Sequence, residues 1–143
     1  VEEMFTSDEL NRVTKLEAYT MESMVIDWDE SSSSKPVMKP LPRWAQVSPM
    51  YAGAIIELED QNILLVGGNL SKVKPQVGAY DASIGTAIHL SENSEWEQSG
   101  FEVFGETREI IELELVNDRM NTKQRILVVS RFNDSPVVFG VNP

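Results

Sequence analysis

The sequence contains no cysteine, and His89 is its only histidine. Without cysteine the chain can form no disulfide, present no thiolate nucleophile and hold no iron–sulfur cluster or cysteine-ligated zinc. A single histidine also excludes a zinc site built from several imidazoles. Lack of cysteine is more typical of a reducing environment, so we expect the cytoplasm or another reducing intracellular compartment.

Long apolar runs and basic residues are also scarce. No run approaches the roughly 18 apolar residues that span a bilayer, and no signal-peptide pattern opens the chain, so we expect no membrane insertion. Acidic residues outnumber basic ones by 23 to 12, which gives a net charge of −11. Such a field repels nucleic-acid phosphates, so we expect no nucleic-acid partner. A protein with an electropositive surface is the partner that this charge favours.

What remains is an ordinary globular composition. The chain has 143 residues, of which 41% are hydrophobic and 24% are charged. A chain of this length buries enough surface to build one core without covalent cross-links. We therefore predict a single domain over residues 1–143.

The N-terminal region has the pattern of a helix. Thr6 and Glu9 are spaced as a capping box, and apolar residues follow at helical spacing from Leu10 and Val13. The pattern predicts a helix over residues 7–24 that docks its apolar stripe on the core. Residues 31–42, rich in serine and proline, are predicted to form an exposed loop without a role in the core.

From residue 52 onward, short β-rich runs alternate with glycine, asparagine, aspartate and proline. This spacing predicts an antiparallel β-sheet over residues 52–141. One hairpin is expected to join residues 54–59 to 63–66, and shorter strands are expected at 86–90, 101–104 and 137–141. The predicted fold class is α+β and β-dominated: an antiparallel barrel or sandwich of about eight strands with an N-terminal helix.

The strongest signal in the sequence is a long hairpin formed by residues 108–116 and 124–132. Matching apolar with apolar and charge with charge favours the register that places Val116 opposite Gln124. This register puts four residues on one buried face and turns Glu112 and Glu114 outward. The four residues are Ile111, Leu113, Leu127 and Val129.

Candidate catalytic groups are few. His89 has Asp81 and Ser83 nearby in sequence, but nothing in the spacing fixes a triad geometry. Two carboxylate pairs, at residues 57 and 59 and at 112 and 114, fall on single strand faces, which is also the pattern of a solvated sheet face. No phosphate-binding or dinucleotide-binding motif occurs. We assign no catalytic, cofactor or metal residue and expect no cofactor.

Three functions are kept open in this order. The absence of converging chemistry favours a non-enzymatic, acidic interaction module, an accessory or assembly factor that binds another protein. The alternative is a binder of small apolar molecules in the interior of a β-barrel of lipocalin-like architecture, and a weaker one is a carboxylate-based hydrolase. Predicted partner-binding residues are acidic or aromatic: Asp27, Trp28, Asp29, Glu30 and Trp44.

Overall fold

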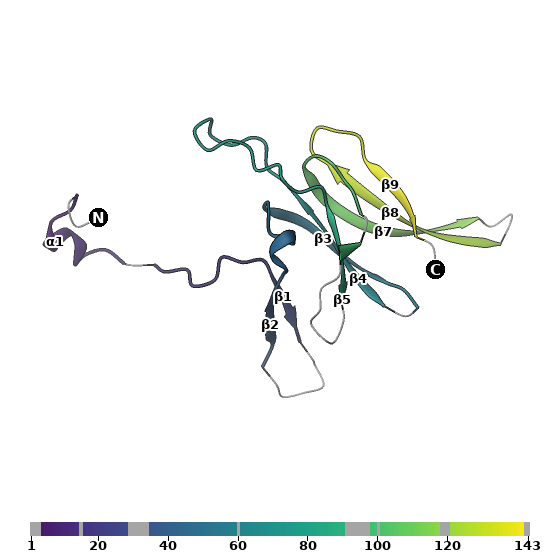
Figure 1. The fold of residues 1–143 in the computed structure, drawn as a ribbon, viewed down its shortest axis with the longest axis horizontal. Helices are drawn as coiled ribbons and strands as arrows, with labels where there is room; N and C mark the ends of the chain where they lie inside the picture. Colours follow the sequence, from purple (N-terminus) through teal and green to yellow (C-terminus); the bar gives the residue numbers. More distant parts are fainter. Residues whose placement is uncertain are drawn as a thin grey trace.

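The computed structural model describes residues 4–14, 16–28, 35–59, 61–90, 98–99, 101–117 and 121–141, and it is dominated by antiparallel β-strands (Figure 1). The predicted β-dominated class is therefore confirmed. The elements are α1 (Ser7–Leu10), β1 (Met24–Asp27), β2 (Val37–Pro40), the 3₁₀ turn η1 (Arg43–Ala45), β3 (Met50–Glu57), β4 (Asn62–Gly68), β5 (Thr86–Leu90), β6 (Gln98–Ser99), β7 (Thr107–Asn117), β8 (Thr122–Arg131) and β9 (Val137–Val141).

These strands form three antiparallel sheets. The β1–β2 hairpin is one sheet, the second has the order β3-β4-β5-β6, and the third has the order β7-β8-β9. The second sheet packs one face on the third, as in a β-sandwich, and its other face on the hairpin and η1. In the part of the chain that the structure describes, the sheets do not close into a barrel.

The middle strand β4 shows why the second sheet is central. Ile63 and Leu65 contribute to the core shared with β7 and β8, whereas Leu64 and Val66 contribute to the core under the hairpin. An uninterrupted apolar run is typical of a strand that is covered on both faces, because alternate side chains point to opposite sides. The order of layers is therefore hairpin, central sheet, three-stranded sheet.

Two consecutive glycines at the end of β4 allow two close approaches. A Cβ atom on Gly68 would lie 1.7 Å from the carbonyl oxygen of Pro49, and one on Gly67 would lie 2.7–2.8 Å from side-chain atoms of Thr107. Any larger residue would push β3 or β7 away. These glycines therefore set the spacing between β4 and its neighbours on both sides.

The N-terminal helix is much shorter than predicted. Thr6 and Glu9 form the expected capping box, but α1 ends at Leu10, and residues 24–27 are in strand β1. Figure 1 shows α1 far from the sheets, at the end of an extended segment. The predicted docking of a helical stripe on the core is wrong, because none of the described sheets lies beside α1 to cover it.

The predicted loop over residues 31–42 contains a strand. Residues 37–40 form β2, and Leu41 is buried in the core beneath the hairpin. Residues 31–34 lie outside the described residues. A long connection does occur elsewhere, between β4 and β5, where Leu70 and Tyr80 pair through both backbone groups (Figure 1).

The hairpins at residues 54–66 and in β7–β8 are confirmed, as are the strands at 86–90 and 137–141. Residues 101–104 are not a strand, although Phe101 and Val103 are buried in the main core. The Val103 N–H donates to the Ile84 carbonyl and the Phe104 carbonyl accepts from Arg131, so separate hydrogen bonds rather than a strand ladder hold this segment.

The register of the β7–β8 hairpin differs from the prediction by one residue. Lys123, rather than Gln124, lies opposite Val116. As a result Ile111 and Leu113 are 39% and 42% exposed, while Ile110 takes the buried position opposite Val129. A shift of one residue exchanges the two faces of a strand. The pattern could not choose between the faces, because apolar residues stand side by side at 110–111 and at 126–129.

Candidate functional site

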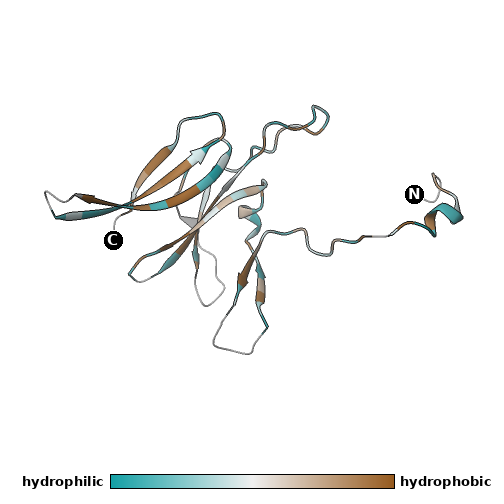
Figure 2. Cartoon of the chain, turned by 180° about the vertical axis from the view of Figure 1, so that it is seen from behind, coloured by the Kyte–Doolittle hydropathy of each residue, from teal (hydrophilic) through white to brown (hydrophobic). Residues whose placement is uncertain are grey.

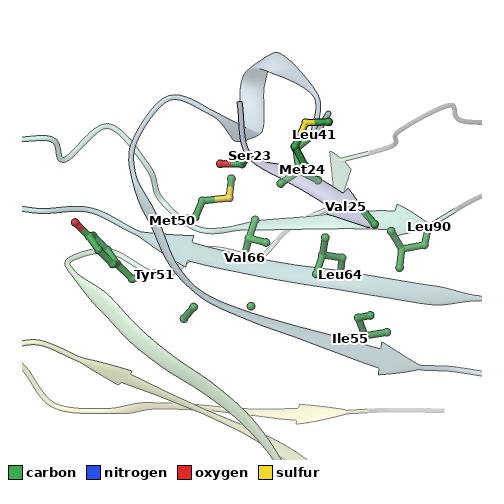
Figure 3. Close-up of a pocket in the computed structure, with 12 residues that line it drawn as sticks. Ser23, Met24, Val25, Leu41, Met50, Tyr51, Ile55, Leu64, Val66 and Leu90 are labelled. Carbon is green, nitrogen blue, oxygen red and sulfur yellow. The ribbon is translucent and has the colours of Figure 1, made fainter. Parts of the chain in front are cut away.

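An apolar groove lies between the β1–β2 hairpin and the outer face of the central sheet (Figure 3). Its volume is about 480 Å³. We call it the hairpin groove. It is lined by Ser23, Met24, Val25 and Leu41 from the hairpin and its flanks, by Met50, Tyr51, Ala52, Gly53 and Ile55 from β3, and by Leu64, Val66 and Leu90 from β4 and β5.

A small hydrogen-bond network holds the base of the hairpin in place. The Leu41 N–H donates to the Ser23 carbonyl, which extends the β1–β2 pairing by one step. The Gln46 side chain joins both strands, because its amide oxygen accepts from the Ser23 N–H at 2.9 Å and its Nε2 donates to the Leu41 carbonyl at 2.6 Å. One wall of the groove is therefore fixed by backbone contacts.

The opposite wall is open because β3 carries little bulk there. Gly53 has no side chain, and Ile55 is 57% exposed on the same strand face. A Cβ atom on Gly53 would make only ordinary contacts, at 3.5 Å or more from Leu65 and other neighbours. The groove can therefore be filled by substitution at this position without displacing the backbone.

The predicted partner-binding residues are spread over the hairpin. Asp27 ends β1 and makes a long 3.9 Å ion pair with Lys39, and Trp28, which follows it, is 67% exposed. Trp44 lies beyond the other end of the hairpin, in η1, and packs against the core under it. The structure therefore does not bring the two tryptophans together. Asp29 and Glu30 lie outside the described residues.

A second, polar hollow surrounds the buried carboxylate of Glu106. Glu106 accepts hydrogen bonds from the backbone N–H and the hydroxyl of Ser71 and pairs with Arg108. The Ser71 hydrogen bonds, followed by the charge and hydrogen bond of Arg108, lower the pKa of Glu106 below its ordinary value of 4.5. A low pKa makes Glu106 a weak general base, and its partners here hold the connection between β4 and β5 to the start of β7.

Two cations stack on one ring beside this carboxylate. Lys72 and Arg108 lie 4.7 and 5.4 Å from the ring centroid of Phe132, and Arg108 is also 4.8 Å from that of Tyr51. Such contacts stabilise by about 0.5–1 kcal/mol each at exposed sites. The cluster therefore links β3, β7 and the end of β8, and we interpret it as structural.

Two of the four carboxylates considered for catalysis are engaged in ion pairs. Glu112 pairs with Arg125 and Glu114 pairs with Lys123, while the Glu57 carbonyl accepts from Arg125 at 2.8 Å. The hydrogen bond to Glu112 is the first cause of a raised pKa at Arg125. Among the described residues, no group of three or more metal-ligating side chains occurs.

The histidine site of the sequence analysis is not assembled either. The His89 Nδ1 lies 2.7 Å from the amide oxygen of Gln61, at the end of β5. Ser83 precedes the start of β5 and is held through its backbone by Asn69. Of the three candidate triad residues, His89 therefore lies near the end of β5, whereas Asp81 and Ser83 precede its start.

The feature that the sequence analysis missed is the exposure of nearly all the described residues of the segment 4–22, which we call the arm. Every described residue from 11 to 22 is exposed. Six large apolar side chains of the arm are between 50% and 89% exposed: Met4, Phe5, Val13, Leu16, Tyr19 and Met21. Figure 2 shows hydrophobic residues along this segment, outside the layered sheets. These apolar residues are visible in the sequence, but their spacing also fits a helix docked on the core, so the sequence does not reveal their exposure.

No helix in the described part of the chain has the length and apolar character needed to cross a bilayer. Comparison with known proteins found no matching family model, no matching curated protein and no matching solved structure.

Proposed function

We propose that this protein is a non-enzymatic interaction module and that its arm binds another protein. The observation that carries the proposal is the arm itself, in which large apolar side chains stay in solvent although the described residues form two hydrophobic cores. Exposed apolar clusters on a soluble chain commonly mark binding surfaces, because leaving them in water is unfavourable.

Charge defines the kind of partner. The arm, residues 4–22, contains four acidic and two basic residues, which leaves 19 acidic and ten basic residues in the remainder. The arm and the rest of the chain are therefore both acidic, and they repel each other as well as other copies of this chain. A protein with an electropositive surface fits both parts, whereas duplex DNA does not.

The proposal is tested by affinity capture from cells that contain the protein, using matched variants as bait. The arm variant replaces Leu10, Val13 and Leu16 by serine. The control replaces Ile111, Leu113 and Leu115, which are exposed on β7, by serine. The proposal expects a partner that the wild type and the control capture and the arm variant loses. Equal capture by the arm variant would refute it.

The tip of the β1–β2 hairpin is a second proposed contact. Trp28 is exposed beside Asp27, so an aromatic anchor is flanked by negative charge. Neutralising Asp27, Asp29 and Glu30 together should slow association with the captured partner and leave the melting temperature unchanged. An association rate that ignores both this change and added salt would exclude electrostatic steering by the tip.

The hairpin groove supports a second candidate function, the binding of a small apolar molecule. A largely apolar hollow of about 480 Å³ lies within the range of ligand sites. Gly53→Leu should fill it, and Gly53→Ala is the matched control. If this second function is correct, a fluorescent fatty acid should bind the wild type and the alanine variant but not the leucine variant. Equal binding to all three would place the probe elsewhere.

A further inference from the structure

The start of α1 is built like the start of a longer helix. Thr6 accepts from the Glu9 N–H, and Glu9 in turn accepts from the Thr6 N–H, so the capping box is complete. Asp8 and Glu9 add negative charge to the first turn, which favours the positive end of the helix dipole. Phe5 and Leu10 occupy the two positions of a hydrophobic staple.

Nothing in the following sequence requires the helix to end at Leu10. Residues 11–22 contain neither glycine nor proline, and Asn11 at the C-cap still has helical backbone angles, with φ −70° and ψ −16°. Isolated helices shorter than about 12–15 residues are marginal in water, because most helix stability in proteins comes from packing of the apolar face. The end of α1 therefore reflects the lack of a surface beneath it.

A continued helix would be amphipathic. At about 100° per residue, Leu10, Val13, Leu16 and Met21 fall on one side, which Glu9 and Glu17 share, while Asp8, Arg12, Lys15 and Tyr19 fall on the opposite side. Asp8 and Arg12 are spaced as a favourable i, i+4 pair. The apolar side is what a groove on another protein can cover.

We propose that residues 7–21 fold into one amphipathic helix when the arm binds, and that its partner is a protein with an apolar groove bordered by basic side chains. This inference rests on the proposed function and specifies its mode of recognition. The acidic body and the acidic arm make a second copy of the chain a poor partner, since both sides carry the same charge.

The helix can be tested on the full chain without a known partner. The probe is a vesicle of phosphatidylcholine mixed with a cationic trimethylammonium lipid, which offers an apolar, electropositive surface. Carbon-13 chemical shifts of residues 7–21 should become helical in the wild type and in Val13→Ala. In Val13→Pro they should stay non-helical around residue 13, because proline breaks a helix interior. Absence of a helical shift in the wild type, or an equal shift in Val13→Pro, would overturn the inference.

Binding to the captured partner separates the two proposals. Val13→Pro should bind on the order of 100-fold more weakly than the wild type, the ratio expected for proline in a helix interior, while Val13→Ala should lose only a few-fold. If the arm variant loses the partner but Val13→Pro binds as well as Val13→Ala, the helix is refuted and the proposed function stands. If the arm variant keeps the partner, the proposed function fails whatever the vesicles show.

Discussion

The arm and strand β4 use similar side chains in opposite ways. In β4, Leu65 and Val66 are 4% and 6% exposed because layers cover the strand on both sides. In the arm, Leu16 and Tyr19 are each 89% exposed. Apolar composition is therefore common to both regions, and only the neighbouring layers decide which side chains build the fold. Those that folding leaves in solvent are available for recognition.

The β7–β8 hairpin also contains both a buried and an exposed leucine. Substitution of the buried one is expected to have the largest effect on the free energy of unfolding. Leu127 is 6% exposed in the core, whereas Leu113 is 42% exposed on the outer face. Leu127→Ala should lower the free energy of unfolding by about 2–5 kcal/mol, and Leu113→Ala should change it by less than about 1 kcal/mol. Urea unfolding of both variants checks this. An equal loss of unfolding free energy in both variants would instead support the register that places Leu113 in the core.

Two glycines of the β3–β4 hairpin differ in the space around them: Gly68 is tightly packed and Gly53 is not. Gly68→Ala should lower stability by about 1–3 kcal/mol, because its Cβ would collide with the Pro49 carbonyl oxygen, 1.7 Å away. Gly53→Ala should be neutral or slightly stabilising, since its Cβ meets nothing closer than 3.5 Å and alanine restricts the unfolded chain. Thermal unfolding distinguishes them, and a neutral Gly68→Ala would mean that β3 and β4 are further apart.

Lowering the pH should reveal how much the Glu106 cluster contributes to the stability of the fold. The folded-state pKa of Glu106 is lowered, first by its hydrogen bonds with Ser71, so its stabilising effect is complete above the ordinary pKa of 4.5 and is lost as pH falls through the lowered value. Glu106→Gln should melt earlier than the wild type at pH 7. The difference should shrink below about pH 4.5. A difference that is constant with pH would show that the charge of Glu106 has no role.

The smallest expected effect on stability is in the arm. Val13→Pro and the removal of residues 1–22 should each change the melting temperature by no more than about 2 °C, because every described residue from 11 to 22 is exposed. Differential scanning calorimetry provides the comparison. A fall of several degrees would show that the arm packs on the body.

Local patterns predicted much of the fold. The capping box at Thr6, the hairpin that joins residues 54–59 to 63–66 and the strands at 86–90 and 137–141 all follow from short-range chemistry and are present. The hairpin register was missed by one residue because Ile110 and Ile111 are both apolar, and only the packing of the layers selects which one is buried.

The candidate site was less accessible to sequence reasoning. The hairpin groove depends on Gly53 lying on the strand face opposite the main core, which requires the layer order and not the local pattern. The exposure of Leu16 and Tyr19 was missed for a related reason. A helical stripe predicts a partner surface, but it does not say whether that surface belongs to the same molecule.

The central claim is that the arm serves binding and not folding. Its most direct test measures the melting temperature and the affinity for the captured partner on the same sample, the variant with serine at positions 10, 13 and 16. The account predicts an unchanged melting temperature, within about 2 °C, and an affinity at least about tenfold weaker than that of the wild type. Unchanged affinity, or a variant that melts well below the wild type, would contradict it.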